Sequence, residues 1–341
     1  MEEEDRLSSL PDDLLHSILR EVPLKHAART SALSQQWASR WLRALASSSV
    51  IDFTDRDFAR GQTPARAAAT VSRCLQLHAD NGAPLDVFRV ALDGCDGAFE
   101  RDVVGWVASA VARGAREVEV DLTPAQGNRA QQLDADQYGV AFLELPGDVF
   151  LTENSLARLS LDRFSLHAVP PGAPGLAGLR SLSLSHADIT DDTVQAVLST
   201  CCFLELLSLT SCHLLTSVRI AGENLRRLEL VRCPAVQDLR VAAPALESFA
   251  FHGDVVHSYS NDDVDDRVAA VDLGATPALR DAYLSHIGFG CEDDANDMEY
   301  AYTDFLSCVA HAPALTLCSV GLQVPYISSL LVVATCYLSR F

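Results

Sequence analysis

A cysteine close to a histidine is the first combination in this sequence that could do chemistry, because a thiol nucleophile needs a neighbouring base. Cys201, Cys202 and His213 come nearest to such a pair. Cys202 directly precedes an aliphatic segment, and Cys212 and Cys233 lie 21 residues apart, each three residues beyond the last leucine of a repeated motif. The spacing predicts that Cys212 and Cys233 are buried repeat positions, and we expect no thiol enzyme.

The other chemical signatures in the sequence are incomplete. The stretch "GFGCED" (288–293) lacks the third glycine of a dinucleotide-binding loop, and no P-loop, G-x-S-x-G or H-E-x-x-H motif occurs. Two acidic stretches, 253–272 and 291–304, lack the D-x-D-x-D-G spacing of a calcium loop. We expect them to be solvated loops, with contact to a basic target segment as the alternative. The sequence predicts no catalytic, cofactor-binding or metal site.

Composition and charge restrict the class of protein and the kinds of partner. A chain of 341 residues with 48% hydrophobic and 21% charged residues is typical of a globular protein with a sizeable core. The formal net charge of −20 disfavours nucleic acid and anionic membranes as partners. The acidic start (1–5) is unlike a secretory signal, and no apolar run is long enough for a membrane helix. We therefore expect the cytoplasm or nucleus, with reduced cysteines.

Three short helices are predicted near the start of the chain. Leucine, isoleucine and valine recur on one helical stripe between residues 11 and 22, and Pro23 ends that helix. A second helix is predicted through "KHAARTSAL" (25–33). Ser34 can cap a third helix, in which Trp37 and Trp41 share a face. Three helices in about forty residues bury little apolar surface alone, so we expect another polypeptide to cover them.

This segment, "LPDDLLHSILREVPLKHAARTSALSQQWASRWLR" from Leu10, resembles the F-box of plant F-box/leucine-rich-repeat proteins, including their FBD-type relatives. The resemblance implies binding to the Skp-type adaptor, and through it to a cullin, of a Skp–cullin–F-box (SCF) ubiquitin ligase. Trp37 would pack the helices together. Gln35 and Gln36 depart from the Lys-Arg pair usual before this tryptophan. The implied adaptor-binding residues are Leu10, Pro11, Leu14, Leu15, Ile18, Leu19, Pro23 and Leu24.

A six-residue pattern, L-x-x-L-x-L, recurs through the rest of the chain. Clear copies begin at 156, 179, 204 and 225, and looser copies begin at 246 and 279. Of the successive spacings of 23, 25, 21, 21 and 33 residues, four fall inside the roughly 20–29-residue window of leucine-rich repeats. Weaker copies at 215 and 236 predict extended segments on both sides of each coil. The stretch 191–203 predicts one helix, and residues 85–122 predict a strand, a helix and a strand.

These patterns predict an α/β fold in which a small three-helix F-box precedes a leucine-rich-repeat solenoid. The expected domains are an adaptor-binding domain over 5–46, a connecting helical segment over 47–84 and the solenoid over 85–341, with acidic insertions at 253–272 and 291–304. The final stretch "LQVPYISSLLVVATCYLSRF" has Arg340 as its only charge. A solenoid needs a polar cap, so we expect a truncated or alternatively spliced product.

Target recognition is expected on two columns of side chains along the solenoid. Alternate residues of a strand face opposite sides, so the residue between the last two aliphatics of each repeat faces solvent. That first column is Ser160, Ser183, Ser208, Glu229, Ala250 and Tyr283. A second column, two residues beyond each strand motif, is Arg163, His186, Ser211, Arg232, Gly253 and His286. Within these columns the target-binding candidates are Arg163, His186, Ser211, Glu229, Arg232, Tyr283 and His286.

The function implied by the resemblance is a non-catalytic substrate receptor that holds an unidentified target protein for ubiquitination. Two alternatives stay open, namely an interaction scaffold without ligase function and an F-box receptor that senses a small molecule. Of the 26 basic residues, only Lys25 is a lysine. GC-rich coding would produce this scarcity, and resistance to self-modification is the functional alternative.

Overall fold

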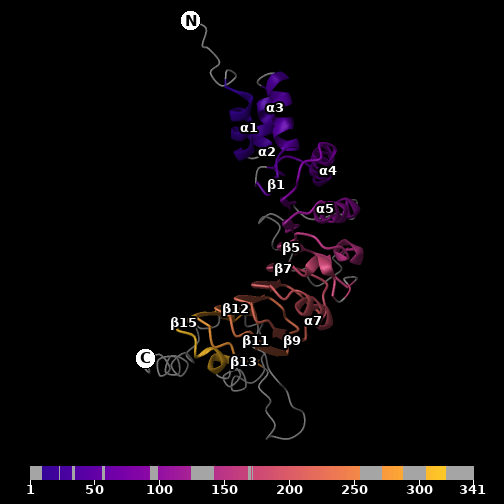
Figure 1. Cartoon of the computed structure of the whole chain (residues 1–341). Helices are drawn as coiled ribbons and strands as arrows, with labels where there is room; N and C mark the ends of the chain where they lie inside the picture. The colour runs from indigo at the N-terminus through magenta and orange to yellow at the C-terminus, as the bar shows by residue number, and fades with distance from the viewer. Residues whose placement is uncertain are drawn as a thin grey trace, which may run out of the picture. The chain divides into compact units, whose positions relative to one another are not determined.

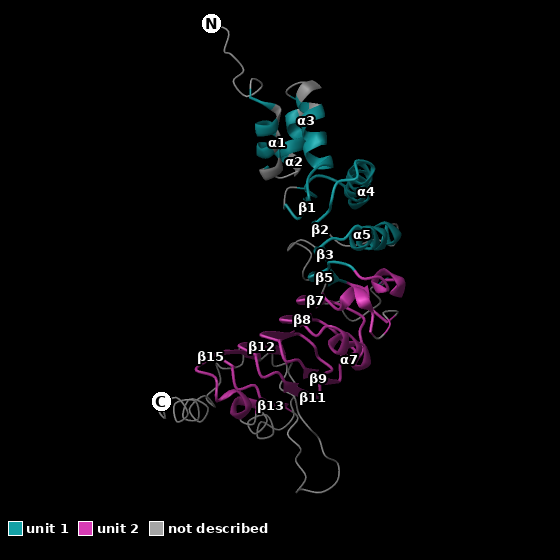
Figure 2. Ribbon diagram, in the orientation of Figure 1, with its two compact units in different colours: residues 1–143, 154–162 teal, residues 144–153, 163–341 magenta. Residues whose placement is uncertain are grey.

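The computed structural model describes residues 10–22, 24–32, 35–55, 58–92, 99–123, 142–167, 170, 172–253, 271–286 and 305–319. The chain divides into two compact units (Figure 2), which are described separately here. Unit 1 comprises residues 1–143 and 154–162, and unit 2 comprises residues 144–153 and 163–341. The acidic insertions and the last 22 residues therefore lie wholly or almost wholly outside the described residues.

Unit 1 begins with the predicted helices (Figure 1): α1 (Asp12–Glu21), α2 (Leu24–Arg29) followed by the 3-10 turn η1 (Thr30–Ala32), and α3 (Gln35–Ala46). The carbonyl of Pro11 accepts hydrogen bonds from the N–H groups of Leu14 and Leu15 at 3.0 and 3.1 Å, which starts α1. Val22 is extended because the residue before a proline is disfavoured in the helical region. The prediction of three helices, the first ending before Pro23, is confirmed.

Parallel strands alternating with helices complete unit 1. Their order along the chain is β1 (Val50–Phe53), α4 (Pro64–Asp80), β2 (Val87–Ala91), α5 (Glu100–Ala112), β3 (Glu117–Asp121) and β5 (Arg158–Asp162). Both helices lie on the same side of the strands (Figure 1). The strand, helix and strand predicted for 85–122 are confirmed. The sheet begins earlier than predicted, because β1 pairs with β2 and the segment 47–84 is thus more than a helical connection.

Unit 2 continues the repeats with two sheets. The main sheet contains β7 (Ser181–Ser185), β8 (Leu206–Thr210), β10 (Arg227–Val231), β12 (Ser248–Gly253), β14 (Asp281–His286) and β15 (Ala314–Ser319) in that order, all parallel. The second sheet contains β9 (Ser217–Ala221), β11 (Asp238–Ala242) and β13 (Val271–Ala275). Extended segments on both sides of the coil were predicted and are confirmed, as is the helix α7 (Asp191–Thr200). Strands β13 and β15 were not predicted, and β13 begins inside the stretch 253–272 that was expected to be a loop.

Short elements complete the described chain. The strands β4 (Leu143–Glu144) and β6 (Phe164–Ser165) pair with each other, and single 3-10 turns lie at η3 (Gly147–Phe150) and η4 (Pro174–Leu176). The core of each unit consists of the alternate aliphatic side chains of its strands, such as Leu228 and Leu230 in β10, which are at most 1% exposed. Burying one leucine contributes about 1.5–3 kcal/mol, so the leucines that pack between neighbouring repeats are the main source of stability.

A buried polar junction connects the N-terminal helices to the first two strand–helix repeats. His78 of α4 is fully buried, its Nε2 lies 2.5 Å from the carbonyl of Ser48, and Arg113 donates to its Nδ1. This arrangement requires the neutral ring with the proton on Nε2. Burial lowers the pKa of His78, and the charge of Arg113 lowers it further, while the bond to Ser48 opposes them. The neighbouring Asn81 amide donates to the carbonyl of Ala46 at 2.9 Å.

The lowered pKa of His78 predicts a loss of stability in mild acid. Unfolding frees this ring to bind a proton below its ordinary pKa of 6.5, whereas the folded chain keeps it neutral. Protons therefore favour the unfolded state, and the free energy of unfolding falls as pH drops below that value. Denaturant titrations across this range should show a shallower decline for His78→Gln than for the wild type. The exposed His213→Gln is the matched control, and equal slopes for all three proteins would contradict the assignment.

Candidate protein-binding sites

The three N-terminal helices share a small apolar core. Leu15 and Leu19 of α1 are buried together with Ala27, Trp37 and Ala44, and Leu10, Val22 and Trp41 pack against them. The guanidinium of Arg40 lies 5.8 Å from the centre of the Trp37 ring, within range of a cation–π contact. The prediction that Trp37 packs the helices together agrees with this core.

A second apolar row on α1 faces solvent. Leu14 is 53% exposed and Ile18 is 46% exposed. They lie four residues apart, and successive residues of an α-helix are rotated by about 100°, so this row is turned away from the row of Leu15 and Leu19. Leu42 of α3 is also exposed. An amphipathic helix with exposed leucine and isoleucine side chains on its outer face is suited to docking in a groove of another polypeptide.

The residues implied as adaptor-binding therefore do not form one exposed ridge. Leu14 and Ile18 are exposed, Pro11 is exposed and Leu10 is half-buried. Leu15 and Leu19 are held inside the helical core, because a helix must bury one of its apolar rows to pack at all. Pro23 and the side chain of Leu24 lie outside the described residues. The accessible part of the predicted surface is the row of Leu14 and Ile18.

The first predicted column of target-facing residues is held in register by the main sheet of unit 2. Backbone pairing places Ser183 beside Ser208, Ser208 beside Glu229, and Glu229 beside Ala250. Ala250 pairs with Tyr283, and Tyr283 pairs with Thr316 of β15. Ser208 is buried, Ser183, Glu229 and Ala250 are half-buried, and Tyr283 is exposed. The most accessible large side chain of this column is therefore an aromatic ring.

The second column has an unusual backbone. Arg163, His186, Ser211 and Arg232 are the four non-glycine residues with positive φ in the described chain, with values of 65°, 46°, 52° and 53°. Each N–H still donates to a carbonyl at the end of the neighbouring strand, from Arg163 to Ser185 at 2.8 Å and from His186 to Thr210 at 2.8 Å. The left-handed turn thus adds one backbone hydrogen bond beyond the end of each strand, at the point where the chain leaves the sheet.

The side chains of this column differ in accessibility. Arg163, His186 and Arg232 are half-buried. Ser211 is only 2% exposed, so its prediction as a target-binding residue is wrong for this conformation; the turn directs its small side chain into the repeat. The side chain of His286 lies outside the described residues, although its backbone ends β14. Burial and the charge of Arg232 lower the pKa of His252, the second-last residue of the adjacent strand β12.

Sequence reasoning missed a network of charges on the sheet of unit 1. Arg89 of β2 donates from Nε to Glu117 at 2.6 Å, and its Nη1 lies 3.4 Å from Asp52. Arg158 holds the other oxygen of Glu117 at 2.7 Å. Burial raises the pKa of Glu119, as do the neighbouring carboxylates, while Arg89 lowers it. The signal was available in the sequence, because these charges alternate with the aliphatic residues of β2 and β3.

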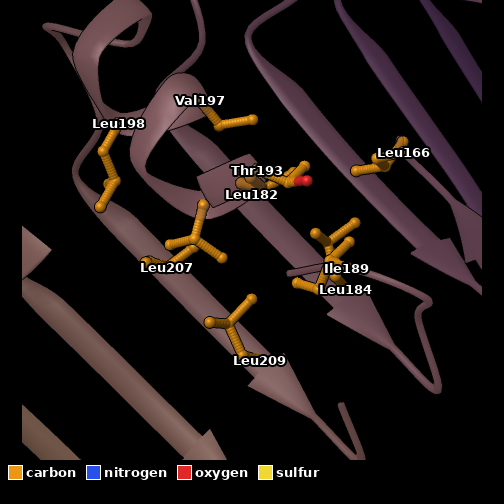
Figure 3. A pocket seen from close by; sticks show the side chains of 10 residues that line it. Leu166, Leu182, Leu184, Ile189, Thr193, Val197, Leu198, Leu207 and Leu209 are labelled. Atoms are coloured by element: carbon orange, nitrogen blue, oxygen red, sulfur yellow. The ribbon is translucent and has the colours of Figure 1, made fainter. Parts of the chain in front are cut away.

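A small apolar cavity lies within unit 2. It lies between α7 and strands β7 and β8, with Val197 and Leu198 on the helix side and Leu182, Leu184 and Leu207 on the strand side (Figure 3). It has about 10 Å³ of space for the centre of a water molecule. Drug-sized ligands occupy pockets of about 300–1,000 Å³, so this cavity does not fit a small-molecule sensor.

The predicted burial of Cys212 and Cys233 is confirmed, whereas Cys202 is exposed. Cys212 and Cys233 are buried, and their thiols donate to the carbonyls of Leu184 and Leu209. Burial raises the pKa of Cys201 to about 12, so this thiol stays protonated at neutral pH. Among the described residues no cluster of three histidine, cysteine or acidic side chains could hold a metal ion. No helix within that part of the chain is long and apolar enough to cross a membrane.

Two family models match the chain. The F-box domain model matches residues 7–44, which include α1, α2 and almost all of α3. The model described as At1g61320/AtMIF1, LRR domain matches residues 76–283, more than half of the chain. The F-box protein At5g03100 of Arabidopsis thaliana is 25% identical over 331 residues, covering 94% of this chain and 91% of that protein.

Two further relatives from Arabidopsis thaliana are longer. The F-box/LRR-repeat protein At5g02910 is 29% identical over 230 residues, covering 67% of this chain and 43% of that protein. The FBD-associated F-box protein At4g10400 is 28% identical over 283 residues, covering 82% of this chain and 61% of that protein. The chain thus spans less than two thirds of the length of these two relatives.

Because α1 has a buried and an exposed row, two neighbouring leucine-to-alanine substitutions should differ strongly in their effect on stability. Leu15→Ala removes packing from the helical core and should lower the free energy of unfolding by about 2–5 kcal/mol. Leu14→Ala acts on an exposed side chain and should change it by no more than about 0.5 kcal/mol. Chemical denaturation followed by tryptophan fluorescence, which reports on Trp37, measures both. Similar losses for the two variants would show that the rows are assigned wrongly.

Proposed function

The chain belongs to the F-box/leucine-rich-repeat family, and from this premise we propose that it is the substrate-recognition subunit of an SCF ubiquitin ligase. F-box domains generally bind Skp-type adaptors. In this proposal the N-terminal helices bind such an adaptor, which connects them to a cullin, and the repeats hold a target protein for ubiquitination. The chain itself carries out no chemistry and acts in the cytoplasm or nucleus.

The observation that carries the proposal is the exposed row of Leu14 and Ile18. Both side chains are large, apolar and about half exposed, although the helix beneath them is already anchored by its buried row. Exposed apolar side chains gathered on a surface mark sites of interaction with another macromolecule. The row lies inside the segment that the F-box domain model matches, which supports a Skp-type adaptor as the partner.

The contribution of the repeats would be proximity. Holding a target beside the ubiquitin-charged carrier converts a bimolecular transfer into an effectively intramolecular one, which accelerates it without any catalytic side chain. The face of the main sheet in unit 2 supplies candidates for this contact. Tyr283 offers an exposed aromatic ring, Glu229 and Arg232 offer charge, and their spacing is set by strand pairing. Tyrosine and arginine are enriched among the residues that dominate protein interfaces.

The two alternatives differ from this proposal in measurable ways. An interaction scaffold without ligase function would leave the row of Leu14 and Ile18 without an adaptor. A small-molecule sensor would need a pocket, whereas the cavity beside α7 has room for about one water molecule. No observation on the described residues favours either alternative over the ligase subunit.

Replacing the exposed row with charge should abolish adaptor binding. We expect Leu14→Asp together with Ile18→Asp to lose co-purification with a Skp-type adaptor, because two carboxylates would be buried against an apolar surface. The fold should persist, since neither side chain belongs to the helical core; circular dichroism checks this. The matched control is Leu214→Asp, which changes an equally exposed leucine of unit 2. A folded double variant that still binds the adaptor as the wild type does would refute the assignment of this surface.

Target binding should depend on the sheet face and not on the N-terminal helices. Tyr283→Ala combined with Arg232→Ala should weaken capture of the target by at least tenfold, while binding of the adaptor is unchanged. The double variant Leu14→Asp, Ile18→Asp should show the converse pattern. Quantitative cross-linking of the wild-type chain with its co-purified proteins identifies the target whose binding is then compared. Loss of both partners in either variant would indicate misfolding and contradict the separation of the two surfaces.

A further inference from the structure

Arginine occupies almost every basic position of the chain, including positions where the contacts do not require a guanidinium. The chain has 26 basic residues, and 25 of them are arginine. Lys25, in the short helix α2, is the single lysine. Arginine and lysine differ where a flat, forked guanidinium bonds several partners at once, and they are nearly equivalent where an exposed cation meets one carboxylate. The described contacts separate these two situations.

Some of the arginines need the guanidinium. Arg89 contacts both Glu117 and Asp52 across neighbouring strands and approaches Glu119 at 3.6 Å, which a single ammonium group could not do in this geometry. Arg113 donates to the buried ring of His78 and, at 3.2 Å, to the carbonyl of Ala83. Lysine would be a poor replacement at either position.

Other arginines make contacts that lysine would make equally well. At the start of the main-sheet strands in unit 2, Arg180 pairs with Glu205 at 2.5 Å, and Arg226 pairs with Glu247 at 3.2 Å. Arg280 approaches the other oxygen of Glu247 at 3.8 Å. The three arginine side chains are 60%, 64% and 73% exposed. Exposed pairs of this kind contribute only about 0–1 kcal/mol, so stability does not account for arginine at these positions.

We infer that the scarcity of lysine keeps the chain from being ubiquitinated by the ligase that it joins, and that Lys25 is its one side-chain acceptor. This inference rests on the proposed function. In the transfer, a neutral lysine amine attacks the thioester between the ubiquitin C-terminus and a cysteine of the carrier. An amide bond forms, the C–S bond breaks, and the thiol leaves with the proton that the amine loses. A guanidinium stays protonated at neutral pH and does not attack, so an arginine surface supplies no acceptor.

The test adds amines where the structure tolerates them. The variant Arg180→Lys, Arg226→Lys, Arg280→Lys keeps each charge beside its carboxylate and introduces three exposed acceptors. Each protein is assembled with the adaptor, the cullin with its RING subunit, and a ubiquitin-charged carrier. Mass spectrometry of the reaction locates the modified amines and separates side-chain attachment from attachment at the N-terminus. We expect the triple lysine variant to be modified several-fold faster than the wild type, at the new positions.

Two control variants separate chemistry from instability. The variant Arg180→Gln, Arg226→Gln, Arg280→Gln loses the same ion pairs without gaining amines, and it should be modified no faster than the wild type. Lys25→Arg should remove the side-chain modification that the wild type retains. A matching increase in the glutamine variant would show that loosened structure, and not the added amines, exposes the chain, which would overturn the inference.

The remaining outcomes distinguish this inference from the proposed function. If the assembly forms and discharges ubiquitin onto free lysine in solution, but the triple lysine variant is modified no faster than the wild type, the scarcity of lysine has no protective effect and reflects coding alone. If no assembly forms with the wild-type chain, the proposed function fails and this inference fails with it. Rapid modification of the wild type at Lys25 would also overturn the inference.

Discussion

Pairing in register between parallel strands is the interaction on which the repeats depend. A single leucine-rich coil cannot bury its own aliphatic side chains, so each strand needs a neighbour on either side to complete its core. The pairing of β8 with β10 shows the consequence: Leu207 lies beside Leu228, and Leu209 lies beside Leu230. The same register aligns the intervening residues, Ser208 and Glu229, on the opposite face. The columns of alternate residues on that face therefore follow from the same strand pairing that builds the core.

The N-terminal helices also divide their apolar residues between a buried side and an exposed side. Helix α1 carries two apolar rows, and only one of them can be satisfied by α2 and α3. Burying Leu15 and Leu19 fixes the helix, and the helical rotation then places Leu14 and Ile18 outward. The exposed row therefore keeps its orientation through the packing of the buried row. The junction at His78 extends this rigidity into the first repeats, since the ring binds the backbone just beyond α3.

Periodicity in the sequence was sufficient to predict most of the repeats, including α7 and the strands β9 and β11 of the second sheet, because aliphatic spacing reports burial directly. It failed for β1, β13 and β15, where short strands stand beside insertions or a helical linker and the L-x-x-L-x-L pattern is absent. The resemblance implied that Leu15 and Leu19 bind the adaptor, whereas both pack in the helical core. Amphipathic spacing shows which residues are apolar but not which row the chain itself covers. Burial of Ser211 escaped prediction for a related reason, since a turn geometry with positive φ has no reliable signal in a non-glycine residue.

Left-handed turns follow four strands, β5, β7, β8 and β10. A non-glycine residue in this conformation costs about 1–2 kcal/mol, yet Arg163, His186 and Arg232 occupy it where glycine would be free of that cost. The hydrogen bond that each N–H donates to the neighbouring strand explains why the backbone adopts this turn. It does not explain why a large side chain is present, because glycine would donate the same bond. Where the buried Ser211 fills the position, packing explains the residue. At the three half-buried positions the larger side chain adds interactions within the chain that glycine would lack, such as the effect of the Arg232 charge on the neighbouring His252.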